Sequence, residues 1–320
     1  MFEFSINRRA VKLAKELCEK SDEYGVAVTE NKLGTCIIDA GLKAKGGFLA
    51  GRKITEICLG GLGEVNVTYM HLNNICIPSI SVFTDHPAVS TLGSQLAGWR
   101  IKIGDYSAVG SGPARALALK PKLIYDKIGY RDKSDGAVLV LETSKEPSTE
   151  VVTYISESCK VPPDRLFIIL TSTSSVAGFT QIAGRIAETG IHKLDELGLD
   201  PKLVMSAWGC APIMPVHQDN IEAMGRINDA ILYGGVAYYV VSHEDDGALK
   251  NLVNQSVSSA SKQYGRPFAE IFREAELDFY KIDPCIFAPA VVTINNARTG
   301  NTFTAGRINM EVLAKSMGLR

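Results

Sequence analysis

The sequence lacks the features that define several large classes of protein. Its 34 lysines and arginines nearly balance 35 aspartates and glutamates, and no block of like charge occurs. Because nucleic acids and membrane surfaces attract clustered basic residues, neither partner is expected. No apolar run reaches membrane-spanning length, and Arg8, Arg9, Lys12 and Lys15 interrupt the region where a signal peptide would need an apolar stretch. We therefore expect a soluble, cytoplasmic protein.

Paired metal-ligand motifs are also missing. The seven cysteines are odd in number, and no two form the CxxC pair that is typical of structural zinc sites. Most lie in apolar stretches such as Ile57-Cys58-Leu59, so we expect small buried side chains that remain thiols. The five histidines form no HxH or HxxxH pair. The sequence therefore predicts no metal site.

Two motifs of common catalytic folds are absent, namely the GxxxxGK[ST] phosphate loop and the GxSxG nucleophile turn. The segment GSGPAR at 110–115 approaches the GxGxxG dinucleotide motif, but Arg115 replaces the third glycine and Pro113 removes an N–H. A dinucleotide fold is therefore disfavoured. A loop that approaches a substrate, with Ser111 and Arg115 as contacts, stays open.

The chain of 320 residues is long enough for two domains or one large α/β unit. Its hydrophobic fraction of 46% can supply a sizeable core. Residues 5–20 predict an amphipathic helix that Ser5 caps. Short strands separated by glycines follow, and we place them at 25–28, 35–39, 54–59, 66–69 and 75–82. Helices are expected after Pro87, with Asp85 as a possible cap, and at 114–118.

From residue 137 the pattern alternates between strand and helix. Strands are expected at 137–142, 166–170 and 203–207, separated by helices at 148–159 and within 171–193. This order is typical of a parallel β-α-β-α-β unit. The later elements are expected as helices at 222–232, 248–263 and 310–317 and as strands at 236–241 and 291–295.

We therefore predict an α/β fold in a two-domain subunit with a cleft between the domains. Residues 1–140 would form a strand-rich α/β domain, and 141–320 would form the βαβ-type domain. The boundary is placed where the longest polar stretches occur. The C-terminal segments could also fold back into the first domain.

The stretch TSTSSVAGFTQIAGRIAETGIHK at 171–193 carries the most chemistry. On a helical wheel, Gln181, Arg185, Glu188 and His192 fall opposite the apolar side chains. This stripe predicts either a cleft-lining face with a carboxylate beside a guanidinium, or a solvated face with an ion pair of roughly 0.2–0.5 kcal/mol. Thr173 lies in the preceding hydroxyl-rich loop, which could receive an anion or polar substrate or simply cap the helix.

A second helix, within RINDAILYGG at 226–235, carries Asn228 and Asp229. An amide and a carboxylate could together recognise the edge of a pterin or a purine. Their other interpretation is an ordinary helix surface or capping role.

Five strings together resemble the methenyltetrahydromethanopterin cyclohydrolase family. They are CLGGLG at 58–63, SVFTDHP at 81–87, AVGSGPARAL at 108–117, GRIAET at 184–189 and AMGRINDAILYGG at 223–235. The resemblance implies interconversion of 5,10-methenyl-tetrahydromethanopterin and water with 5-formyl-tetrahydromethanopterin. It also implies an α/β two-domain subunit and a cytoplasmic homotrimer. No metal or redox cofactor is implied, because the pterin derivative is the substrate.

The RxxE spacing carries the family's catalytic carboxylate and arginine to Glu188 and Arg185. Glu188 would then act as general base and general acid. The candidate substrate contacts are side chains of the motifs above, namely Asp85, Ser111, Arg115, Thr173, Asn228 and Asp229. Two alternatives stay open: an α/β enzyme that binds phosphate at 110–115, and a non-catalytic pterin-binding protein.

Overall fold

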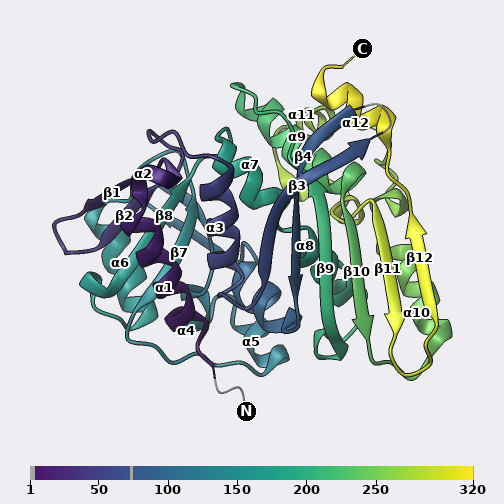
Figure 1. The fold of residues 1–320 in the computed structure, drawn as a ribbon, viewed down its shortest axis with the longest axis horizontal. Helices are drawn as coiled ribbons and strands as arrows, with labels where there is room; N and C mark the ends of the chain where they lie inside the picture. Colours follow the sequence, from purple (N-terminus) through teal and green to yellow (C-terminus); the bar gives the residue numbers. More distant parts are fainter. Residues whose placement is uncertain (1–3, 73–74, 320) are drawn as a thin grey trace. The chain divides into compact units, whose positions relative to one another are not determined.

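Two six-stranded sheets, one in each of two units, organise the part of the chain that the structure describes (Figure 1). This computed structural model describes residues 4–72 and 75–319. The first unit comprises the chain up to Glu64 and Ala88–Gln181, and the second comprises Val65–Pro87 and the chain from Ile182. No helix among the described residues is long and apolar enough to cross a membrane. The predicted mixed α/β class is confirmed.

The sheet of the first unit has parallel strands at its centre. Its strands, in the order β1-β2-β8-β7-β6-β5, are Ala27–Glu30, Cys36–Asp39, Leu166–Thr171, Ala137–Glu142, Tyr106–Ser111 and Trp99–Ile103. Strand β8 pairs in parallel with both β2 and β7, whereas β1, β6 and β5 add antiparallel edges. Strands β7 and β8 are almost wholly apolar and buried, as expected for strands that are covered on both faces.

Alternate residues of β7 pack into two different cores. Val138 and Val140 lie in a cluster with α1, Ile6–Glu19, and α3, Phe48–Cys58. Leu139 and Leu141 lie in a cluster with α6, Thr149–Cys159. The two-residue period of the strand thus covers both faces of this sheet with helices. The remaining helical segments of the unit are α2 (Ser21–Tyr24), the π-helix η1 (Ala88–Gln95), α4 (Ala114–Ala118), α5 (Lys122–Ile128) and η2 (Pro163–Arg165).

The second unit contains the other sheet, in the order β12-β11-β10-β9-β4-β3. These strands are Thr302–Gly306, Val291–Asn296, Val236–Val241, Val204–Pro212, Ile75–Thr84 and Glu64–Leu72. Only the β10–β11 pair is described as parallel, while β9 pairs antiparallel with both β10 and β4. Its helices are α8 (Ile186–Glu196), η3 (Pro201–Leu203), α9 (Asn220–Gly234), α10 (Asp246–Gln255), η4 (Ser258–Ala260), α11 (Phe268–Glu274), η5 (Phe279–Lys281), η6 (Pro284–Ile286) and α12 (Met310–Met317). The boundary between the units falls within helix α7, Val176–Ala183, in the sequence.

Several predicted elements are confirmed. The opening helix is α1, and the Ser5 side chain accepts the Arg8 N–H as its cap. Helix α6 likewise follows the Ser148 cap, and β7, α4 and α12 match their predicted bounds. Helix α10 ends at Gln255, earlier than predicted. The division at residue 140 stays a prediction; that residue lies inside β7 of the first unit.

Two predictions are wrong. Residues 54–58 belong to helix α3, with Leu59 as its C-cap, rather than to a strand, because Ala50, Ile54, Ile57 and Cys58 fall on one buried helical face. The β-α-β-α-β unit stops after β7-α6-β8, since the next strand, β9, joins the sheet of the second unit. Strands β5, β6 and β12 and helices α5 and α11 were not predicted.

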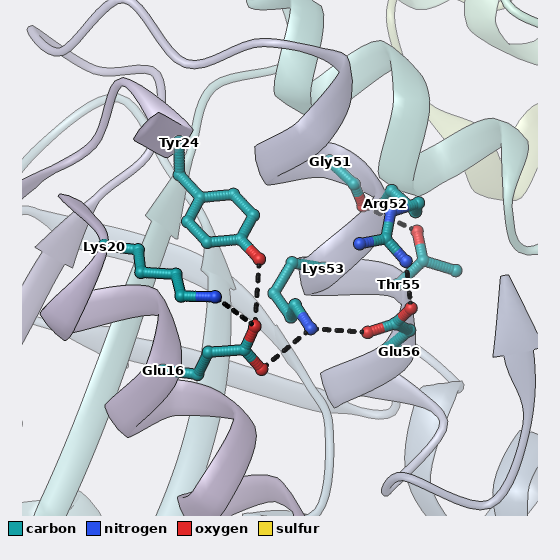
Figure 2. A network of polar contacts seen from close by, with 8 residues as sticks. All are labelled: Glu16, Lys20, Tyr24, Gly51, Arg52, Lys53, Thr55 and Glu56. Atoms are coloured by element: carbon teal, nitrogen blue, oxygen red, sulfur yellow. Dashed lines mark hydrogen bonds and ion pairs between the residues drawn. The ribbon is translucent and has the colours of Figure 1, made fainter. Parts of the chain in front are cut away.

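A charged network joins α1 to α3 (Figure 2). The Lys53 ammonium lies 3.0 Å from Glu16 of α1 and 3.0 Å from Glu56 of its own helix. Burial lowers the pKa of Lys53, but hydrogen bonds to Glu56 and Glu16 raise it by more. The hydrogen bond from Lys53 likewise holds the pKa of Glu16 below its usual value, against the effect of burial. One buried ammonium therefore holds two helices that cover the same face of the sheet.

We expect Lys53→Met to lower the free energy of unfolding of the first unit by about 1–3 kcal/mol, because two carboxylates lose their shared donor. The matched control is Lys20→Met, whose half-exposed ammonium lies 3.6 Å from the same Glu16. That change should stay within about 0.5 kcal/mol. Denaturant unfolding of both variants measures the difference. Equal effects would contradict the importance of the buried position.

Candidate active site

The helix that is predicted within 171–193 is interrupted at residues 184–185. Helix α7 ends at Ala183 and α8 begins at Ile186, so Arg185 is the N-cap residue of α8 rather than a residue inside one continuous helix. The Arg185 N–H bonds to the Ile182 carbonyl at 2.9 Å, which closes the turn between the two helices. The single polar stripe of four side chains is therefore wrong: Gln181 is buried, whereas the His192 side chain is 42% exposed.

Arg185 and Glu188 nevertheless lie side by side. Arg185 Nη1 is 3.5 Å from Glu188 Oε2, and the two side chains are only 10% and 6% exposed. The solvated-face interpretation of this pair is therefore wrong. Removing both charges from water carries a large desolvation cost, which their mutual attraction offsets only in part. The 3.5 Å contact is also longer than the 2.7–2.9 Å that is usual for a strong charge-assisted hydrogen bond.

The local structure supports a carboxylate at this position. Glu188 lies in the first turn of α8, where unpaired N–H groups and the helix dipole favour negative charge. Arg185 occupies the N-cap position of the same turn, without a capping hydrogen bond from its side chain. Helix α8 packs on β9 and β10 of the second sheet, so its first turn has a rigid support. The pair is thus a buried, loosely bonded carboxylate and guanidinium at a helix start, an arrangement that suits proton transfer.

In the first unit, polar side chains gather at the carboxyl ends of parallel strands. Thr173 follows β8 and donates its hydroxyl to Glu142, which ends β7, at 2.8 Å. Ser175 Oγ accepts the Gly178 N–H, so the capping interpretation of this hydroxyl-rich loop is observed. A binding role for Thr173 stays a prediction.

Asp39 ends β2 at the same edge and was missed by the sequence reasoning. Burial raises the pKa of Asp39. Hydrogen bonds from the four backbone N–H groups of residues 41–44 lower it by more and hold this pKa below its usual value. The Asp-Ala-Gly sequence at a strand end is a turn signal that could have indicated it. The carboxylate shapes the loop after β2. A side-chain carbon at Gly41 would come within 2.2 Å of Ser175 Oγ, so this loop lies against the loop after β8.

Ser111 and Arg115 are buried in the first unit. Ser111, at the end of β6, is 4% exposed and lies 3.8 Å from the Cys58 sulfur. The Arg115 guanidinium donates to the carbonyl oxygens of Leu92, Ser94 and Lys120. It therefore braces the loops around η1 from inside. These contacts occupy the group on which the phosphate-binding alternative depended, and the roles of Ser111 and Arg115 toward a substrate stay predictions.

The remaining predicted contacts lie in the second unit. Asp85 is exposed, and its Oδ1 accepts the hydroxyl of Ser206 at 2.7 Å. The Asn228 amide is half-buried and donates to the Met224 carbonyl one helical turn before it. Asp229 is fully buried, and its Oδ1 accepts the N–H of Phe268 at 2.8 Å. The carboxylate of Asp229 thus anchors the start of α11 to α9.

Comparison with known proteins agrees with these motifs. The profile of the family described as Cyclohydrolase (MCH) matches residues 5–317. The methenyltetrahydromethanopterin cyclohydrolase of Methanothermobacter marburgensis is 45% identical over 318 residues, which cover 98% of this chain and 99% of that protein. The chain belongs to the methenyltetrahydromethanopterin cyclohydrolase family. The cyclohydrolases of Methanococcoides burtonii and Methanocaldococcus jannaschii are 42% and 43% identical, over 99% and 98% of both chains.

Family membership confirms the resemblance that the five strings predicted. The match to the cyclohydrolase profile also extends beyond those strings, through α1 at one end and α12 at the other.

Asp229 provides a test of the structure around α9. Burial raises the pKa of Asp229 to about 7, against an unfolded value of about 3.9. The unfolded chain therefore ionises this group at lower pH than the folded chain does. Stability from this source should fall as pH rises from about 4 to about 7, by up to about 1.4 kcal/mol per pH unit.

We expect Asp229→Asn to remove this loss, so that the variant gains stability relative to the wild type between pH 4.5 and pH 7.5. Denaturant unfolding at several pH values measures the difference. Asp85→Asn is the control for replacing an exposed aspartate of the same unit. A difference between Asp229→Asn and wild type that does not change with pH would contradict the raised pKa.

Proposed function

We propose that this chain interconverts 5,10-methenyl-tetrahydromethanopterin and water with 5-formyl-tetrahydromethanopterin, and that Glu188 and Arg185 carry the chemistry. Its membership of the cyclohydrolase family supports the reaction. The observation that supports the residues is the buried pair of Arg185 and Glu188 at the start of α8. A charged pair that is less than about a tenth exposed and weakly bonded is costly for stability alone.

The substrate chemistry requires a base and then an acid. The methenyl carbon lies between N5 and N10 and is electron-poor because the amidinium is cationic. Glu188 takes one proton from water as the water oxygen bonds to this carbon, which gives a neutral carbinolamine. The bond from the carbon to N10 then breaks, and Glu188 returns its proton to N10. The carbinolamine hydroxyl loses its proton as the formyl C=O forms, so one proton is released overall.

Arg185 contributes orientation and charge. Its planar guanidinium stabilises the negative charge of the carboxylate and limits its rotation, which a lysine ammonium would not reproduce. The cationic substrate also attracts a negative carboxylate. General acid–base assistance of this kind is worth about 10²–10⁴-fold in rate.

The substrate contacts are proposed with the same reaction. Thr173 and Asp85 keep side chains that are partly or fully accessible, and Asn228 is half-buried. We propose these three as polar contacts of the pterin substrate. The side chains of Ser111, Arg115 and Asp229 are buried and contact other parts of the protein. These contacts give the three residues a structural role, and their contact with a substrate stays a prediction. A homotrimer is proposed from the family resemblance, and light scattering of the purified protein tests it.

Glu188→Gln should lower kcat by about 10²–10⁴-fold, because the amide cannot accept the proton of water. The assay follows loss of the methenyl chromophore with purified protein. Glu196→Gln is the matched control, since this carboxylate lies on the same helix but is 44% exposed. Because the change leaves Arg185 buried without its partner, unfolding of each variant must be measured in parallel. Near-wild-type turnover by folded Glu188→Gln would rule out the assignment.

Substrate preference tests the reaction independently of any residue. We expect kcat/KM for methenyl-tetrahydromethanopterin to exceed that for methenyl-tetrahydrofolate by at least about tenfold, or about 1.4 kcal/mol in transition-state binding. The two compounds share the reacting amidinium, so the difference reports the rest of the pterin. Equal values would contradict the proposed substrate class.

A further inference from the structure

Tyr239 lies directly behind the start of α8. It occupies β10, is fully buried, and donates its hydroxyl to the Ala187 carbonyl at 3.0 Å. Ala187 immediately precedes Glu188 in the first turn of the helix. Among the described residues, this is the one side-chain hydrogen bond to the backbone of that turn, so it links the second sheet to the residue beside the carboxylate.

Glycines make this close approach possible. A side-chain carbon at Gly190, in the next turn of α8, would come within 1.9 Å of the Tyr239 hydroxyl oxygen. A side-chain carbon at Gly209 of β9 would come within 2.9 Å of the Ala187 nitrogen. The helix therefore packs against the sheet at van der Waals distance at both glycines. Even a methyl group at either glycine would displace the first turns.

Tyr239 is also within electrostatic reach of Glu188. Burial raises the pKa of Tyr239, and the charge of Glu188 raises it further. The hydrogen bond of the phenol goes to the backbone of Ala187 and not to this carboxylate.

The position of Tyr239 matters because α8 begins at Ile186, just after the N-cap residue Arg185. The first turn of a helix lacks half of its backbone hydrogen bonds and is the part that frays most easily. Glu188 and its 3.5 Å contact with Arg185 both belong to that turn. A displacement of about 1 Å at a reacting group can lower the rate by about 10²-fold. Something must hold the turn while the carboxylate itself stays loosely bonded.

We propose that Tyr239 is a positioning residue for the reaction: its hydrogen bond to Ala187 fixes the first turn of α8 and so aims Glu188. This inference rests on the proposed catalytic role of Glu188. Tyr239 does not contact the substrate and exchanges no proton with it. The adjacent Tyr238, which is 37% exposed on the same strand, makes no such bond to α8 among the described residues and serves as the matched control.

The test compares Tyr239→Phe with Tyr238→Phe. Tyr239→Phe should lower kcat about 10-fold to 100-fold while KM changes by less than about twofold, because the carboxylate is misplaced but binding surfaces stay intact. Tyr238→Phe should keep wild-type values. Assays run well below the unfolding temperature of each variant, so that only folded protein is compared. A purely structural role for Tyr239 would lower the unfolding temperature and leave kcat of the folded protein unchanged, which would overturn the proposal.

Hydrogen exchange gives a second readout that does not depend on activity. In Tyr239→Phe, the amides of residues 188–191 should exchange faster than in wild type, while those of α9 should not change. Unchanged exchange at 188–191 would overturn the proposal whatever the rate. The Glu188→Gln variant separates the two claims. If Glu188→Gln is inactive and Tyr239→Phe is normal, only the positioning role fails. If Glu188→Gln is active, the proposed function fails as well.

Discussion

The candidate site of the second unit buries one carboxylate and one guanidinium away from water. The structure around the site must offset the cost of this burial. Glu188 and Arg185 attract each other at 3.5 Å, but the attraction at this distance does not fully offset the desolvation free energy of the two charges. Around them the chain supplies a helix start, a tightly seated sheet and the Tyr239 hydrogen bond. These contacts stabilise the fold around a carboxylate, proposed to be catalytic, that stays buried and incompletely bonded.

The break between α7 and α8 has a physical function in this account. A continuous helix would satisfy the N–H groups around residue 185 and place both side chains along one face. Ending α7 at Ala183 and starting α8 at Ile186 leaves Glu188 in a first turn, where the helix dipole favours a carboxylate. It also places Arg185 at the N-cap position of α8. The RxxE spacing thus serves a helix start, which explains how two charges remain adjacent in a buried place.

Sequence reasoning succeeded where local signals are strong. The cap at Ser5 and the apolar run of β7 predicted their elements closely. It failed at 54–59, because a short apolar run fits a buried helix as well as a strand. It also failed to place β9, since strand order along the chain does not record which sheet a strand joins. At the site, the RxxE spacing and the family resemblance nominated Arg185 and Glu188, which the structure places side by side, and their catalytic role stays a prediction. Sequence reasoning could not show that Arg115 and Asp229 are buried, since charged side chains are usually exposed.

Arg185 and Glu188 are proposed to act as one unit, and a double-mutant cycle on kcat/KM measures the coupling between them. The four proteins are the wild type, Arg185→Ala, Glu188→Gln and the variant with both changes. If the guanidinium acts through the carboxylate, the double variant should be about as slow as Glu188→Gln alone, with a coupling free energy above about 1 kcal/mol. If the two losses simply multiply, the residues contribute independently, and the account of the site is contradicted.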